Sequence, residues 1–315
     1  MATRTKVKTL LDSKFNRWVK TIDDEDLRRD VTRGSIITGG AIVSMLLDEN
    51  VNDYDIYFNS YELTARVAEY YLEKYRQTFA TTHTVELKRA DEGRPFFMIK
   101  SVGIISAKNE EDKKYEYFEQ YGANDEDATA GQNYLSSISI KHKKPKQGTE
   151  YKERYVPLCF TENAITVSDG IQLILRFAGN PAEVHKNFDF VHCQCYWQSW
   201  DSKIVLPQAA LESILTKDLK YTGSLFPIAS LFRLRKFIRR GWTINAGQIL
   251  KIVMQVNNLN LSDLQVLRTQ LIGVDVAYMI ELVDKLEAQQ KTDGTESFDV
   301  NTYITHLIDE IFDAE

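Results

Sequence analysis

The chain has 315 residues, of which 43% are hydrophobic and 27% are charged, the balance of an ordinary globular protein of about two domains. Its 15 Phe, 16 Tyr and 4 Trp residues can fill a sizeable core, so the composition excludes a disordered chain. The 15 Gly and 6 Pro residues are too few for a collagen-like or linker-dominated protein. The net charge of −6 excludes a histone-like protein that holds nucleic acid through bulk positive charge, but it permits a local basic groove.

Cysteine usage and hydropathy indicate an intracellular protein. Cys193 and Cys195 lie two residues apart and Cys159 lies far from both, so the cysteines do not form a disulfide framework and are expected to be reduced thiols. The first twenty residues contain no apolar core of signal-peptide length, and the apolar stretch at 171–177 is broken by polar residues. We therefore expect a cytoplasmic protein with no membrane partner.

The first quarter of the chain alternates between helical and strand patterns. Residues 5–20 have one apolar stripe and one basic face, which is the spacing of an amphipathic helix. A short strand at 35–38, a helix at 39–47, a strand at 54–58 and a helix at 60–78 follow. The order strand, helix, strand, helix is typical of an α/β or α+β core.

The middle of the chain contains a charged insertion. A strand is expected at 96–107, and the residues at about 108–155 are charged and weakly periodic, so we interpret them as an insertion with long loops. Its basic run at 141–146 is interpreted as a solvated loop in preference to a nucleic-acid contact.

Regular structure is expected again after the insertion. The sequence at 164–177 has two β-rich runs around Ser168-Asp169-Gly170, which favours a hairpin turn. Asn180-Pro181 favours the start of a short helix, and 187–196 is expected to be a strand.

The rest of the chain is helical in pattern, so we place a domain boundary near residue 205. The predicted fold class is α+β: a mixed sheet with flanking helices over 1–205, including the insertion, followed by an all-helical domain over 206–315. The expected helices are 207–216, 224–240, 245–257, 261–271, 275–290 and 299–313.

The segment 36–58 contains the residues that we expect to bind phosphate and metal. Gly39-Gly40 ends a strand and opens a helix, so the backbone can approach a ligand closely and the helix N-terminus can face a phosphate. Asp53 and Asp55 are two apart on a strand, so their carboxylates lie on one face, about 7 Å apart along the backbone. An Asp-x-Asp pair alone is common at turns and solvated edges. At this spacing after Gly-Gly, it favours Mg²⁺, which prefers oxygen ligands and completes its shell with substrate phosphates.

Gly39-Gly40, twelve intervening residues and Asp-x-Asp resemble the DNA polymerase β-type nucleotidyltransferase superfamily, and most of all its CCA-adding and poly(A) polymerase branch. That branch reads roughly G-G-x-V-R-D-x-L-L-G-x-x-x-x-D-h-D-h, and the register holds without a gap. Val43-Ser44 stands in place of the branch's Arg-Asp, and Asp48 in place of its Gly. The chain therefore lacks the arginine of the branch's triphosphate contact, which argues against a plain CCA-adding enzyme.

A second resemblance lies in the helical part. The segment 227–244 is similar to the neck helix of the same branch, at Pro227, Leu234, Arg235, Phe237, Gly241, Trp242 in place of Phe, and Ile244. The surrounding residues are strongly basic: Arg233, Arg235, Lys236, Arg239 and Arg240. They form either a phosphate-facing surface or an exposed face balanced by acidic C-terminal residues such as Asp309, Glu310 and Asp313.

The superfamily uses a third carboxylate on a neighbouring strand, and its position here has two interpretations. Asp189 lies between two Phe residues, which is the expected apolar setting, and we favour it. The rival register places Gln172 at that position, so that the site would lack a ligand. Glu162 and Asp169 are weaker candidates because both fall near turns.

Two other groups of residues have a structural interpretation. His192 would face away from Cys193 and Cys195 on a strand, so a zinc site is not favoured. The tryptophans in the second half of the chain can stack on a base, but core packing is expected for at least two of them: Trp197, Trp200 and Trp242.

The resemblance implies a magnesium-dependent nucleotidyltransferase that moves a nucleotide from an NTP such as ATP to an acceptor hydroxyl and releases pyrophosphate. Two Mg²⁺ ions would be held by Asp53, Asp55 and Asp189, which are also the catalytic candidates. The nucleotide-binding candidates are Thr38, Gly39, Gly40, Ser44, Arg235 and Arg239.

The neck-like helix favours an RNA acceptor with a tRNA-like 3′ end. Transfer to a protein or small molecule, and a non-catalytic binding or structural protein that kept the fold, stay open as alternatives. Chains with this pattern also occur among nucleotidyltransferases of large tailed phages, so the resemblance extends to a phage protein acting in the host cytoplasm. The sequence favours no oligomeric state.

Overall fold

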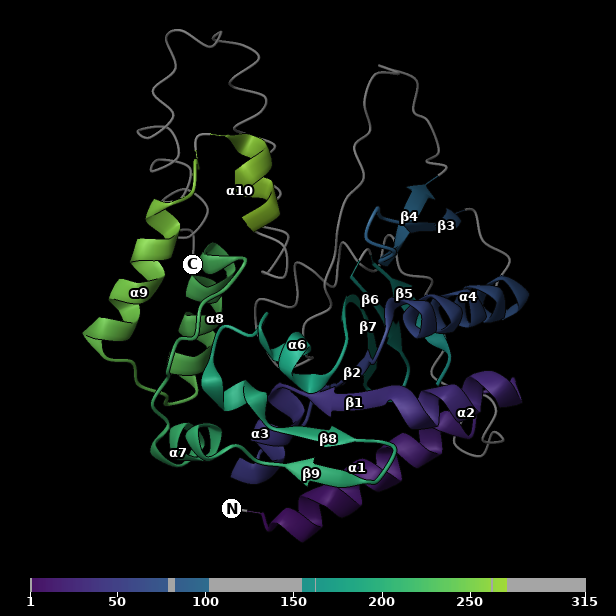
Figure 1. Cartoon of the computed structure of the whole chain (residues 1–315), viewed down its shortest axis with the longest axis horizontal. Coiled ribbons are helices and arrows are strands. Elements are labelled where there is room, and N and C mark those ends of the chain that lie inside the picture. Colours follow the sequence, from purple (N-terminus) through teal and green to yellow (C-terminus); the bar gives the residue numbers. More distant parts are fainter. Residues whose placement is uncertain (1, 79–82, 102–154, 162, 262, 271–315) are drawn as a thin grey trace, which may run out of the picture.

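The computed structural model describes residues 2–78, 83–101, 155–161, 163–261 and 263–270. Strands and helices are interspersed up to Val205, and the described elements between Gln208 and Gln270 are helices (Figure 1). The helices are α1 (Arg4–Val19), α2 (Glu25–Gly34), α3 (Gly40–Leu47), α4 (Tyr61–Thr78), α6 (Pro181–His185), the 3₁₀ helix η2 (Val191–Gln194), α7 (Gln208–Thr216), α8 (Pro227–Arg239), α9 (Ala246–Asn257) and α10 (Leu264–Gln270). The strands are β1 (Ser35–Thr38), β2 (Tyr54–Phe58), β3 (His83–Arg89), β4 (Pro95–Ser101), β5 (Pro157–Phe160), β6 (Ala164–Val167), β7 (Ile171–Ala178), β8 (Tyr196–Gln198) and β9 (Lys203–Val205).

A seven-stranded mixed sheet forms the centre of the molecule. Its strand order is β5-β6-β7-β2-β1-β8-β9, in which β2 and β7 are parallel and the other neighbours are antiparallel. The hairpin of β3 and β4 forms a separate two-stranded sheet. A mixed sheet with flanking helices confirms the predicted α+β class.

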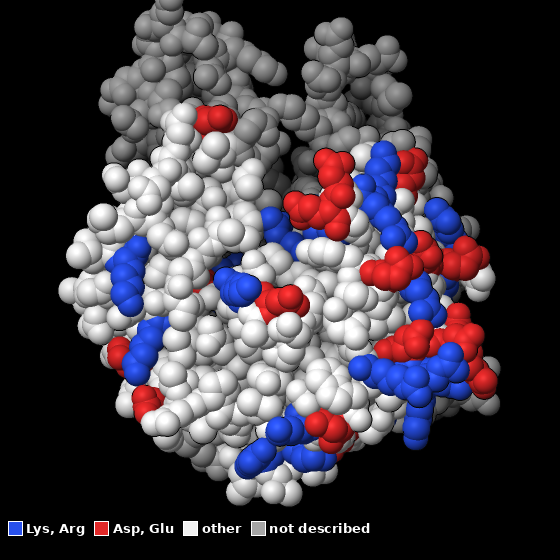
Figure 2. Space-filling model, in the orientation of Figure 1, with Lys and Arg blue, Asp and Glu red and all other residues white. Residues whose placement is uncertain are grey.

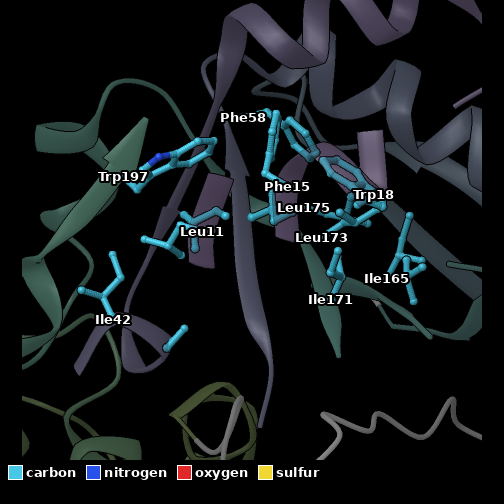
Figure 3. Packing of buried hydrophobic residues seen from close by; sticks show 14 of the residues in the cluster. Leu11, Phe15, Trp18, Ile42, Phe58, Ile165, Ile171, Leu173, Leu175 and Trp197 are labelled. Atoms are coloured by element: carbon cyan, nitrogen blue, oxygen red, sulfur yellow. The ribbon is translucent and has the colours of Figure 1, made fainter. Parts of the chain in front are cut away.

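The hydrophobic core lies between this sheet and the helices of the first quarter. The apolar stripe predicted for α1 is buried, and Figure 3 shows Leu11, Phe15 and Trp18 packed towards side chains of β2, β7 and β8. Trp18 is fully buried, and its indole N–H donates to the Tyr71 hydroxyl of α4 at 2.7 Å. A buried indole needs such a partner, so this bond fixes α1 against α4.

The turn between β6 and β7 positions the start of β2. Asp169 and Gly170 have φ of 63° and 66°, the left-handed pair of a tight hairpin, as Ser168-Asp169-Gly170 predicted. The amide of Tyr54 donates to the carbonyl of Gly170 at 2.9 Å, and a Cβ on Gly170 would lie 2.8 Å from the carbonyl oxygen of Asn52. The hairpin turn therefore braces the residues that lead into Asp53.

One predicted strand is wrong. Residues 187–196 form no continuous strand, because Phe190 makes only an isolated bridge to Tyr221 and the next four residues turn into η2. In this turn the carbonyl of Cys193 accepts the amide of Gly39 at 3.2 Å. Backbone bonding to the glycine turn thus overrides the β-rich composition of this segment.

Other sequence expectations agree with the structure or fall outside its described residues. The strand at 54–58 is confirmed, and helices occur close to the positions expected between 207 and 271. The elements α2, β3, β5, β8 and β9 were not predicted. The insertion at about 108–155, apart from its last residue, and the helices expected at 275–290 and 299–313 lie outside the described residues. The boundary near 205 stays a prediction.

Charges of both signs are mixed on the molecular surface. Figure 2 shows lysine and arginine interspersed with aspartate and glutamate, most densely over α2 and α4. Arg66 of α4, for example, pairs with Asp30 of α2 at 2.6 Å, an exposed pair of the kind that adds little stability. Among the described helices, none combines the length and apolar character that a bilayer crossing requires.

The Gly170 contact yields a stability prediction. We expect Gly170→Ala to lower the free energy of unfolding by about 2 to 4 kcal/mol, because alanine is strained at positive φ and its Cβ would also overlap the Asn52 carbonyl. Gly93→Ala is the matched control, since Gly93 has φ of 82° but open space at its Cβ position, and it should cost about 1 kcal/mol. Urea unfolding of both variants measures the difference, and equal losses would contradict the close contact.

Candidate functional site

The turn between β1 and α3 is a glycine turn that faces a carboxylate. Gly39 has φ of 92° and ψ of −148°, a conformation open to glycine alone. A Cβ on Gly39 would lie 3.4 Å from Oδ2 of Asp55, whereas one on Gly40 would meet no atom within 4 Å. The backbone of the turn therefore lies beside the Asp55 carboxylate, and the space next to Gly40 is open to a ligand.

Asp53 and Asp55 stand at the start of β2, and both are half-buried. Burial raises the pKa of Asp53, while the positive charge of Lys236 on α8 acts in the opposite direction. A carboxylate that is ionised and partly buried is stabilised by a cation at its oxygens. A cation bound between Asp53 and Asp55 would therefore reduce the free-energy cost of burying their negative charges.

The chemistry of these donors fits a magnesium ion that is shared with a substrate. Mg²⁺ is commonly held by one or two protein carboxylates and by substrate phosphates, and Asp53 and Asp55 offer two carboxylates beside open space. In the part of the chain that the structure describes, no group of three or more His, Cys, Asp or Glu side chains could hold a metal ion. Asp53 and Asp55 fit a Mg²⁺ ion whose remaining ligands include the phosphate oxygens of a bound substrate.

The structure does not gather Asp189 into such a group with Asp53 and Asp55. Asp189 is 7% exposed and pairs with Arg233 of α8 at 2.7 Å. The residue beside Asp55 on the neighbouring strand is Gln172, as in the rival register. Asp189 as third ligand stays a prediction. Asp169 lies at the exposed hairpin turn, and Glu162 lies outside the described residues.

One side of α8 is anchored to the acidic residues around this site. Arg233 pairs with Asp189, and Arg240, which caps α8, donates to the Ser44 hydroxyl at 3.4 Å and pairs with Glu49. Lys236 lies between them, three residues after Arg233 and four before Arg240, so the three residues share one side of the helix. We call Arg233, Lys236 and Arg240 the α8 basic face.

The predicted nucleotide contacts Arg235 and Arg239 lie elsewhere on the helix surface, and both are exposed. Arg235 points away from the α8 basic face, whereas Arg239, three residues after Lys236, lies at its border. The prediction from the sequence named all five basic residues of this segment, but it did not single out Arg233 and Arg240 as the ones that contact Asp189, Ser44 and Glu49. The signal was the spacing of 233, 236 and 240, which repeats once per helical turn.

Thr38 lies beneath the glycine turn, with no exposed surface. Its hydroxyl is 2.9 Å from Nε2 of His185 and donates to the carbonyl of Cys195 at 2.9 Å. Thr38 therefore supports the glycine turn from below through its hydroxyl contacts and does not lie on the surface that would face a ligand. Ser44 is also buried, at 8% exposure, and its hydroxyl accepts from Arg240.

His192 occupies an aromatic box at the contact between η2 and the end of α8. Its ring centroid is 4.5 Å from that of Phe237 and 4.3 Å from that of Trp242. The side chain is fully buried, and neither ring nitrogen has a hydrogen-bond partner. Burial lowers the pKa of His192 to about 4, so the ring is neutral at physiological pH.

The neighbouring thiols are held in the protonated form by burial. Burial raises the pKa of Cys195 to about 12 and that of Cys193 still further, so both remain protonated. The disfavoured zinc interpretation therefore gains no support. Trp197 and Trp242 are buried in the core as expected, whereas Trp200 is 47% exposed.

A family model described as "Gabija anti-defense 2 family protein" matches residues 9–217. This range includes the glycine turn, Asp53, Asp55 and Asp189, and it ends before α8. No curated protein sequence matches the chain.

Solved structures that match the chain at low identity include a CCA-adding enzyme, a tRNA-processing enzyme and a tRNA nucleotidyltransferase. The Thermotoga maritima CCA-adding enzyme in complex with tRNA is 9% identical, with a TM-score of 0.36 over 88% of this chain and 54% of that one. A tRNA-processing enzyme with CTP is 11% identical, with a TM-score of 0.36 over 87% and 58%. A tRNA nucleotidyltransferase with primer tRNA and an ATP analogue is 12% identical, with a TM-score of 0.34 over 90% and 68%. The chain spans little more than half the length of the first two.

The aromatic box predicts a pH dependence of stability. Unfolded histidine titrates near pH 6.5, whereas His192 in the folded protein titrates near 4, so the unfolded state binds more protons between these values. Stability is therefore full above about pH 6.5 and falls as the pH drops towards 4, by at most about 1.4 kcal/mol per pH unit from this residue.

His192→Phe removes the titrating group from the apolar box and should flatten this dependence. Denaturant unfolding at several pH values between 4 and 7 measures the slope for both proteins. An unchanged slope in the variant would show that other groups cause the acid sensitivity, because His185 is also shifted to about 4.

Proposed function

The chain belongs to the Gabija anti-defense 2 family, and on this premise we propose that it is a metal-dependent nucleotidyltransferase whose reaction opposes the Gabija defence. One observation carries the proposal: the glycine turn at Gly39 lies directly beside the Asp55 carboxylate, with open space next to Gly40. The glycine turn supplies a backbone that can face a phosphate, and Asp53 and Asp55 supply oxygens that can bind a metal beside it.

Each residue of the site has a role in this proposal. The amides of the first turn of α3, which begins at Gly40, bind the phosphates, because these N–H groups have no partner within the helix. The amide of Gly39 is already bonded to the carbonyl of Cys193. Asp53 and Asp55 hold two Mg²⁺ ions with the nucleotide. When bound, the metal supplies charge neutralisation at the reacting phosphate and the pyrophosphate.

The proposed reaction is an in-line displacement at the α-phosphorus of the NTP. The acceptor hydroxyl oxygen forms the new P–O bond, the bond between the α-phosphorus and the bridging oxygen to the β-phosphate breaks, and pyrophosphate leaves with the electron pair. Asp189 is proposed to take part in activating the hydroxyl. The protein contributes mainly by holding the two reactants in line.

An RNA with a tRNA-like 3′ end is the first proposed acceptor, supported by the neck-like sequence of α8 and by its contacts with the site. Transfer to a protein is the second candidate. The family assignment favours it, because a reaction directed against a defence is most direct when a component of that defence is the acceptor.

The central test is nucleotide incorporation by the intact chain. We expect label from an α-labelled NTP to appear on RNA or protein in the presence of Mg²⁺, and Asp53→Asn/Asp55→Asn to reduce it at least about hundredfold. Asp26→Asn on α2 is the matched control, because it removes an exposed carboxylate that pairs with Arg29 of the same helix and has no role in the proposed site. The same variants are then compared for protection of a target from the Gabija defence.

Equal incorporation by the wild type and the double variant would contradict the enzymatic proposal. Protection that persists in the double variant would instead indicate a binding protein with the same fold. The partition of label between RNA and protein decides the acceptor class.

The third carboxylate has its own test. If Asp189 helps to activate the hydroxyl, Asp189→Asn should lower incorporation about tenfold or more, and adding Arg233→Met to remove the unpaired, half-buried charge should restore stability without restoring activity. If Asp189 only anchors α8, the Asp189→Asn/Arg233→Met variant recovers both stability and incorporation. Under the rival register, Gln172→Glu places a carboxylate beside Asp55 and raises the incorporation rate.

A further inference from the structure

We propose that the α8 basic face is a phosphate subsite, in which Lys236 binds the polyphosphate of a metal-bound nucleotide. The inference rests on the proposed function and specifies which residues bind that substrate. It differs from the sequence expectation, which assigned nucleotide contacts to Arg235 and Arg239.

The first step is the position of Lys236. The α8 basic face is anchored before Lys236 by the Arg233–Asp189 pair, and after it by the contacts of Arg240 with Ser44 and Glu49. Asp189 lies four residues before Cys193, whose carbonyl binds the amide of Gly39, and Ser44 lies on α3, which begins at Gly40. Lys236 is one helical turn from each anchor, so it lies on the side of α8 that carries both contacts.

The second step is the charge of Lys236. Burial raises the pKa of Asp53, and the positive charge of Lys236 opposes that shift, which agrees with the position of Lys236 on this side of α8. The side chain is exposed, and its long flexible stem lets the charge move towards a ligand at the site. Lys236 therefore acts on the same carboxylate that would hold a metal.

The helix α3 has no positively charged side chain. Its residues are Gly-Ala-Ile-Val-Ser-Met-Leu-Leu, so it carries no cation for a polyphosphate, and Val43 is buried at 1% exposure. The negative charge of a triphosphate has to be balanced from another element. The α8 basic face is the part of the described structure whose anchors reach both α3 and the segment that bonds to the glycine turn.

These positions predict that metal and polyphosphate bind cooperatively. A metal ion at Asp53 and the ammonium of Lys236 repel one another when no anion is present, so Lys236 weakens binding of the metal alone. A polyphosphate between them is attracted to both. Lys236 thus couples the two ligands, and such a coupling is reciprocal.

The test measures binding of two probes to the full chain. Titration calorimetry gives the affinity for inorganic tripolyphosphate with Mg²⁺, and electron paramagnetic resonance gives the affinity for Mn²⁺ alone. In Lys236→Met we expect tripolyphosphate binding to weaken about tenfold and binding of Mn²⁺ alone to tighten about threefold. Lys236→Arg should stay within about threefold of the wild type on both, since the charge is kept.

Lys251→Met is the matched control, because it removes an exposed lysine from α9 and should change neither affinity. Unchanged thermal unfolding midpoints exclude a folding defect, which is not expected at an exposed residue. If Lys236→Met binds tripolyphosphate as tightly as the wild type while the wild type incorporates nucleotide, the subsite is overturned and the proposed function stands. If the wild type binds no tripolyphosphate with Mg²⁺, both are overturned.

Discussion

The approach of the Gly39 backbone to the Asp55 carboxylate is the constraint on which the site depends. A strand that ends in a positive-φ glycine can turn into a helix within one residue, and no side chain separates that turn from β2. Because β1 and β2 are antiparallel neighbours, the end of one strand meets the start of the other. The result is a backbone suited to phosphate beside a carboxylate pair suited to a metal.

Charge is arranged around that contact so that opposite signs come from different parts of the chain. The carboxylates belong to the sheet, its loops and the segment before η2, whereas the α8 basic face belongs to the helical part. The net charge of −6 is therefore an average over a surface on which both signs are mixed. Ion pairs between α8 and the sheet-containing part hold together elements that are more than forty residues apart in the chain.

Apolar packing supports the same junction. His192 and Trp242 stack between η2 and the end of α8, and Thr38 fills the space under the glycine turn with its hydroxyl bonded to the backbone. These polar groups are buried without access to a ligand, so they serve the geometry of the site and not its chemistry.

The sequence by itself determined the local elements at the site, including the strand at 54–58, the helix after Gly39-Gly40 and the hairpin at Ser168-Asp169-Gly170, because glycine conformation and side-chain alternation are local properties. Only the tertiary structure decided that 191–194 is a 3₁₀ turn, because the bond from Gly39 to Cys193 joins residues that are distant in sequence. It also decided that Gln172 lies beside Asp55, since strand register depends on pairing across the sheet. The tertiary structure likewise decided that Arg233 and Arg240 of α8 pair with Asp189 and Glu49, because a helical pattern shows which residues share a side but not which side meets the sheet-containing part.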